Sequence, residues 1–137
     1  MKNSNFNIKS RAASLRHALR GLLQFAHSEI NGKIQIIVAI TVIILGILFD
    51  ISLFDWTAVV LSISAVFALE IVNTAIEKMY NLYSVKQSNE IRDIKDLGAA
   101  AVLITSVAAL VNGILIFVPK IFELMQGVFL WPQGNQL

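Results

Sequence analysis

The sequence contains no cysteine and only two prolines in 137 residues. The lack of cysteine excludes disulfides, thiolate metal sites and thiol nucleophiles, so any catalytic group must carry oxygen or nitrogen. Charged residues are scarce as well, at 15% of the chain, against ~25% in an average soluble domain. The formal net charge of +2 is too small to indicate nucleic acid as a partner. No Gly-rich phosphate loop is present, which excludes a Walker-type nucleotide site.

Hydrophobic residues, in contrast, make up 56% of the chain. A soluble domain of this length could hardly bury so much apolar surface. In lipid, every backbone N–H and C=O must be paired within the protein, so long apolar runs should form helices. We therefore expect an all-α integral membrane protein with a single domain over residues 1–137.

Three apolar runs, at residues 34–49, 54–80 and 97–118, are expected to be membrane helices. The first is slightly short for the ~20 residues that a bilayer core requires, and Asn31 and Lys33 could extend it by reaching toward the interface. The polar segment 85–96 is interpreted as an extramembrane loop. Pro119 is expected to close the third span, which leaves residues 121–137 as a tail.

Residues 7–30 combine spaced leucines with cationic residues. This pattern predicts an amphipathic surface helix that lies in the headgroup region of a membrane. A solvated, flexible arm is the alternative. The first strong apolar run begins only near Ile34 and no small-residue cleavage site follows it, so we expect no removable signal.

Basic residues are distributed unevenly between the ends of the expected spans. Five of the eleven Lys and Arg residues fall between Lys2 and Arg20, and the region 78–95 is also basic, whereas the turn at 50–55 has none. Because basic residues collect on the cytoplasmic side of a membrane, both basic regions should be cytoplasmic and the carboxyl terminus should lie outside.

Glu70, Asn73 and Glu77 form the most informative polar cluster. Their spacings of three and four residues place all three on one face of a helix. Carboxylates near membrane depth are costly and are usually functional or paired, although both could instead mark the end of the span and sit in water. Two carboxylates and an amide suit Mg²⁺, which prefers oxygen ligands and completes its shell with water and phosphates.

Further candidates lie on the same expected side of the membrane. Glu29 could supply another oxygen, while Lys95 and Asp96 offer a phosphate-binding cation and a hydrogen-bonding carboxylate. His17 is included as a nucleotide-binding candidate, beside the alternative that it is only a polar-face residue of the surface helix. No nucleophile motif accompanies it, so a Ser-His-Asp hydrolase has no support.

Two blocks of sequence, EIVNTAIE at 70–77 and KDLGAAAVL at 95–103, resemble the prokaryotic diacylglycerol kinase family, which includes undecaprenol kinases. The resemblance extends from about Ser14 to Pro119. It implies a homotrimer in a bacterial cell (inner) membrane, each subunit with a surface helix and three membrane helices. It also implies an active site at the cytoplasmic face that uses ATP and Mg²⁺ to phosphorylate diacylglycerol or undecaprenol.

The resemblance implies roles for the candidate residues. Glu70 would be the general base for the lipid hydroxyl, Glu29 and Glu77 would hold Mg²⁺ with the phosphates, and Asn73 would support that geometry. Lys95 and Asp96 would contact the nucleotide. The sequence differs from the family pattern at Gly32, Asn81 and the segment 85–89, and the small residue at Gly32 could reshape the lipid entrance.

Two other classes of function compete with the kinase. A non-enzymatic membrane protein, either a transport or assembly component or an inactive relative, would use Glu70 and Glu77 for ion passage or assembly. A lipid phosphatase would need a His nucleophile or a basic phosphate cluster, which Arg92 and Lys95 alone do not form. The sequence does not distinguish diacylglycerol from a polyprenol, because apolar helix faces look alike in either case.

Overall fold

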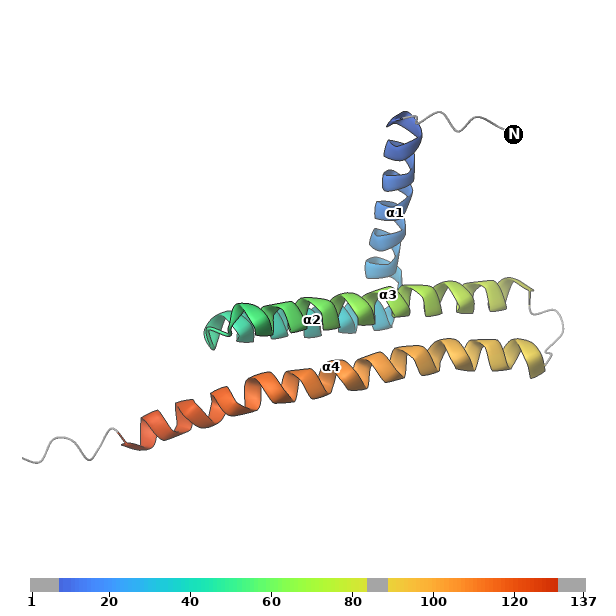
Figure 1. The fold of residues 1–137 in the computed structure, drawn as a ribbon. Coiled ribbons are helices and arrows are strands. Elements are labelled where there is room, and N and C mark those ends of the chain that lie inside the picture. Colours follow the sequence, from blue (N-terminus) through green and yellow to red (C-terminus); the bar gives the residue numbers. More distant parts are fainter. Residues whose placement is uncertain (1–7, 84–88, 131–137) are drawn as a thin grey trace, which may run out of the picture.

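The computed structural model describes residues 8–83 and 89–130, which form four α-helices: α1 (Ile8–Ser28), α2 (Ile30–Leu48), α3 (Leu53–Tyr83) and α4 (Asn89–Leu130). Helices α2, α3 and α4 run alongside one another, while α1 projects away from them (Figure 1). This arrangement confirms the all-α fold expected from the composition.

Helices α2, α3 and α4 are each long and apolar enough to cross a membrane. Many of their large apolar side chains are exposed, including Ile37, Leu61 and Leu103, each at 64–65%. Such exposure is expected of helices whose solvent is lipid, where the backbone is satisfied within each helix. Few apolar side chains are buried among the described residues, and Ile51, Val59 and Phe117 form a cluster of them.

The turn between α2 and α3 is closed by local hydrogen bonds on both sides. Asp50 adopts a left-handed φ of 46°, and its N–H donates to the carbonyl of Ile47, while the Ile51 N–H donates to that of Gly46. These two bonds form a Schellman motif that satisfies the last carbonyls of α2. Ser52 then caps α3, because its hydroxyl accepts the Asp55 N–H at 3.1 Å and its own N–H donates to the Asp55 carboxylate at 3.2 Å.

A single residue, Glu29, separates α1 from α2. Its backbone is extended (φ −99°, ψ 130°) and its side chain makes no capping hydrogen bond to α2. Close packing fixes this junction, since a Cβ added at Gly32 would lie 2.8 Å from the Phe25 carbonyl oxygen. The small residue noted at this position is therefore required by the contact between the two helices.

The boundaries of α4 differ from the expected ones at both ends. Residues 89–96 are helical, although their polarity was interpreted as a loop, because Glu, Arg and Lys are good helix formers and polarity indicates only contact with water. The helix also continues through Pro119 to Leu130. Proline fixes a helix-compatible φ, and membrane helices tolerate the one hydrogen bond it removes. Residues 85–88 and 131–137 lie outside the described part of the chain.

Candidate active site beside the junction of α1 and α2

Polar and charged side chains gather where the junction of α1 and α2 meets the second half of α3 and the start of α4. The helices and the junction contribute Glu29, Asn31, Glu70, Asn73, Glu77, Lys78 and Lys95. The junction lies at the end of α2 that is away from the turn between α2 and α3, partway along α3 (Figure 1).

Glu70 is the deepest of these groups, with only 3% of its surface exposed. Its Oε1 accepts a hydrogen bond of 2.9 Å from Nδ2 of Asn31, which lies in the first turn of α2. A buried carboxylate is costly unless it is paired or hydrogen-bonded, so this contact partly offsets the cost of burial. From the sequence, Asn31 was expected only to reach toward the membrane interface, because no spacing along the chain connects it to a residue 39 positions away.

Asn73 lies one turn beyond Glu70 and is 7% exposed. Its Oδ1 is buried and has no hydrogen-bond partner within the described residues. A Cβ added at Gly98 would lie 2.7 Å from this oxygen, so α4 approaches α3 closely at this point only because residue 98 is glycine. The structure thus presents a buried, unused acceptor next to Glu70, of the kind that functional sites retain.

Two ion pairs lie one turn further along α3. Lys78 Nζ is 2.8 Å from Glu29 Oε1, and Lys95 Nζ is 3.6 Å from Glu77 Oε1. Both pairs are partly exposed, with Lys95 and Glu77 each at 41%, so water screens them and each contributes little to stability. Such pairs can rearrange at low cost when a more strongly charged ligand, such as a phosphate chain, is bound.

The two carboxylates proposed for metal binding come from different parts of the chain. Glu29, at the junction, pairs with Lys78 of α3, while Glu77 of α3 pairs with Lys95 of α4. Among residues 8–83 and 89–130, no three His, Asp or Glu side chains form a group that could hold a metal ion by themselves. A metal ion held by Glu29 and Glu77 would therefore need further ligands, such as the water and phosphate oxygens that complete the shell of Mg²⁺.

The remaining candidates are not drawn into this cluster. His17 is exposed on α1, and Asp96 is exposed on α4 although the adjacent Lys95 joins Glu77. Neither makes an ion pair or a side-chain hydrogen bond to the part of the chain that the structure describes. The structure therefore brings together Glu29, Glu70, Asn73, Glu77 and Lys95, adds Asn31 and Lys78, and leaves His17 and Asp96 outside.

The polar cluster lies within a part of the chain that is similar to known proteins. Residues 16–117 match the model of a family described as prokaryotic diacylglycerol kinase. The undecaprenol kinase of Bacillus subtilis (strain 168) is 36% identical over 108 residues, which cover 79% of this chain and 88% of that protein. The matched region contains every contact of the polar cluster described above.

Proposed function

Because the chain belongs to the prokaryotic diacylglycerol kinase family and is a lipid kinase, we propose that it transfers the γ-phosphoryl group of ATP to the hydroxyl of a membrane lipid alcohol, with Glu70 as general base. The observation that carries this proposal is the buried Glu70 carboxylate, held by Asn31 and followed along α3 by two lysine–glutamate pairs. An acceptor inside the apolar layer and cations at its edge match a substrate with a hydroxyl in lipid and phosphates in water.

In the proposed reaction, Glu70 takes the proton of the lipid hydroxyl as that oxygen forms a bond to the γ-phosphorus. The bond from this phosphorus to the bridging oxygen breaks at the same time, and ADP leaves with that oxygen. Asn31 holds Oε1 of Glu70 and thereby fixes the orientation of the carboxylate toward the hydroxyl. Glu70 afterwards loses its proton to water, which restores the base.

The charged residues next to Glu70 are proposed to hold the nucleotide. Lys95 would contact its phosphates, and Asn73 would support the geometry of the site. Magnesium held by Glu29, Glu77 and the phosphates would offset the negative charge of the nucleotide when bound. Asp96 and His17 are proposed to contact the nucleotide only in the assembled, substrate-bound enzyme.

Undecaprenol is the acceptor that we propose to test first, with diacylglycerol as the second. The relative from Bacillus subtilis is an undecaprenol kinase, and the family model is named for diacylglycerol. The family assignment favours a kinase over the transport and phosphatase hypotheses.

We further propose that the enzyme is a homotrimer in the bacterial inner membrane, with its site at the cytoplasmic face and α1 on the membrane surface. The exposed leucines of α1, among them Leu15 and Leu23 at 62–63%, supply a face that can enter the headgroup region. The exposed Ala99 and Ala100 offer a surface for close packing between subunits. Gly98 packs against Asn73 of the same chain and is therefore not part of this proposed surface.

The test is a transfer assay with the purified full chain in mixed micelles containing Mg²⁺ and labelled ATP. Undecaprenol and diacylglycerol are offered separately, with Glu70→Gln as the inactive variant and Glu123→Gln, an exposed carboxylate on α4, as the matched control. We expect the label to appear in one of the two lipids. It should be lost in Glu70→Gln and when a chelator removes Mg²⁺, and it should be kept in Glu123→Gln. Folded protein that labels neither lipid would contradict the proposal.

A further inference from the structure

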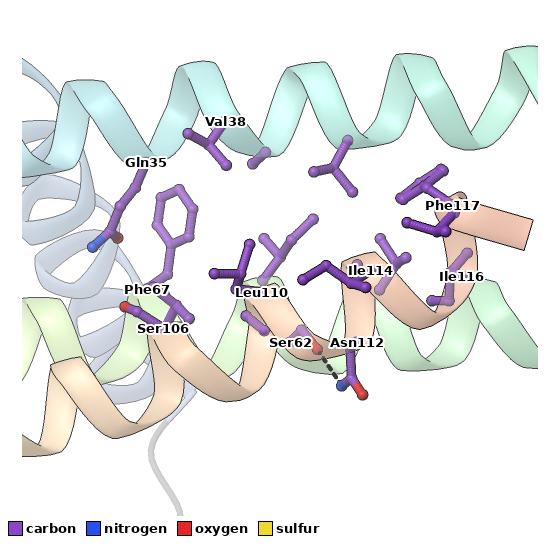
Figure 2. A pocket seen from close by; sticks show the side chains of 18 residues that line it. Gln35, Val38, Ser62, Phe67, Ser106, Leu110, Asn112, Ile114, Ile116 and Phe117 are labelled. Atoms are coloured by element: carbon purple, nitrogen blue, oxygen red, sulfur yellow. Dashed lines mark hydrogen bonds between the residues drawn. The ribbon is translucent and has the colours of Figure 1, made fainter. Parts of the chain in front are cut away.

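A cavity of about 520 Å³ lies between α2, α3 and α4 (Figure 2). Its volume is within the range of ~300–1,000 Å³ that is typical of small-molecule sites. The lining is mostly apolar, and side chains from α2 point across it toward those from α3 and α4. The polar cluster described above does not line it, so this is a separate feature of the molecule.

One end of the cavity begins next to the hydrogen bond between Asn31 and Glu70. Gln35 lines it from α2, four residues and about one turn beyond Asn31, and Phe67 lines it from α3, three residues before Glu70. Figure 2 shows Gln35 and Phe67 together at this end. The Phe67 ring packs edge-on against Phe25 at 6.2 Å between centroids, which ties this end to α1.

From there the cavity extends along the helices toward the turn between α2 and α3. Its lining on α4 runs from Ser106 to Val118, a rise of about 18 Å. Phe117 lies at the far end and packs against Phe49 at 6.0 Å between ring centroids. The cavity is therefore elongated along the direction in which hydrocarbon chains run in a membrane, and an aromatic pair lies at its distal end.

The polar groups of the lining are distributed in a way that suits an amphiphile. Nδ2 of Asn112 donates a hydrogen bond of 3.0 Å to Oγ of Ser62 (Figure 2). At the end near Glu70, Oε1 of Gln35 is buried and has no hydrogen-bond partner within the described residues. The lining thus places the polar side chains of Gln35 and Ser106 at the end near the reacting group, and it is mostly apolar elsewhere. Water needs two to four polar partners, which this lining does not supply along its length.

We propose that this cavity binds the hydrocarbon chain of the lipid alcohol, in the segment that follows the reacting hydroxyl. The inference rests on the proposed function, since it takes Glu70 as the position of that hydroxyl. A chain attached there and running parallel to α2–α4 passes Gln35 and Phe67 and enters the cavity. A hydrocarbon chain in the cavity would supply the van der Waals contacts that the lining side chains lack when the cavity is empty.

Substitutions that fill the cavity test the proposal by kinetics. Ala109→Leu adds bulk to the lining, whereas Ala108→Leu makes the same change at the preceding residue, which is exposed and not part of the lining. Gly113→Leu is a second filling variant, because a Cβ there meets no atom within 4 Å. We expect both filling variants to lower kcat/KM for a long-chain alcohol at least ~10-fold, mainly through KM. The filling variants should not change kcat/KM for a short-chain analogue or KM for ATP. Ala108→Leu should not change any of these quantities.

A binding measurement separates this inference from the proposed reaction. The chain has no cysteine, so Gly113→Cys and Ala108→Cys each introduce a single thiol for a membrane-permeant reagent. We expect undecaprenol or diacylglycerol to slow modification at position 113 several-fold and not at position 108. Protection without phosphoryl transfer would contradict the proposed function and support the cavity.

Three results would overturn the inference. The first is equal loss of activity toward long- and short-chain alcohols in the filling variants. The second is an active enzyme that shows neither protection at position 113 nor an effect of filling. The third is efficient disulfide formation between copies of the Gly113→Cys protein, which would place a second copy at the cavity.

Discussion

The hydrogen bonds of the polar groups differ between the turn joining α2 to α3 and the polar cluster beside the junction of α1 and α2. At the turn between α2 and α3, residues only three to five positions apart satisfy one another through the Schellman motif and the Ser52–Asp55 cap. In the polar cluster, the Asn31–Glu70 contact joins residues 39 positions apart, and Oδ1 of Asn73 is left without a partner.

We therefore expect residues near the turn to affect mainly stability, and residues near the junction to affect mainly the proposed activity. The turn end carries the buried cluster of Ile51, Val59 and Phe117, so changes there should act on folding. The junction end keeps a buried carboxylate, an unused acceptor and two ion pairs that water screens and that therefore contribute little to stability. In the proposed function, these groups bind the substrates. Substitutions at the two ends should therefore move different measurements.

The largest effect is expected for Glu70→Gln. Loss of the general base should lower kcat about 100- to 10,000-fold, while the unfolding free energy in detergent stays within experimental scatter because the amide keeps an acceptor oxygen for Asn31. The lipid kinase assay and a denaturant titration measure the two quantities. A variant that unfolds readily and retains kcat per folded molecule would show that Glu70 stabilises the fold and is not the general base.

The next largest effect is expected for Asn31→Leu. Without the hydrogen bond from Asn31, the Glu70 carboxyl group is no longer oriented toward the lipid hydroxyl, so kcat should fall roughly tenfold, which corresponds to ~1.4 kcal/mol in the activation free energy. KM for ATP should not change, because Asn31 contacts Glu70 and not the lysine–glutamate pairs. Lys33→Leu, two residues further along α2 and exposed, is the control. A larger effect on KM for ATP than on kcat would contradict a positioning role.

One substitution, glycine to alanine, can be made at both ends and compared directly. At Gly46 the new Cβ would lie 2.8 Å from the Trp56 ring, and at Gly98 it would lie 2.7 Å from Asn73 Oδ1. Each should cost ~1–3 kcal/mol of unfolding free energy, as overpacking does. Only Gly98→Ala should also lower kcat of the folded enzyme.

Gly113→Ala is the control for this pair, since its Cβ meets open space and should not destabilise the protein. Equal kcat in the Gly46 and Gly98 variants would remove Asn73 from the proposed site.

The smallest effect is expected for Ser52→Ala at the turn. Removal of a helix cap costs ~1 kcal/mol, and the activity of the folded enzyme should not change because the site lies at the opposite end of α2. Unfolding titrations of the wild type and the variant measure the loss. A drop in kcat without a loss of stability would show that the turn is coupled to the site.

Several features of the molecule could be predicted from the chain alone, for physical reasons that act locally. Lipid leaves the helix as the only way to satisfy a long apolar run, so composition indicated three membrane helices. The helical period placed Glu70, Asn73 and Glu77 on one face. The prediction was weaker where polarity and proline were used as boundary signals, because residues 89–96 and Pro119 both lie within α4.

Other features depend on which helices meet. The contact of Asn31 with Glu70, the pairing of Glu29 with Lys78 and the approach of Gly98 to Asn73 all join different segments. No periodicity in the sequence encodes such pairs, since they are set by the packing of one helix on another. The cavity between α2, α3 and α4 has the same origin. The sequence by itself determined the elements and their membrane solvent, while tertiary packing decided which side chains form the site and where a lipid chain has space to bind.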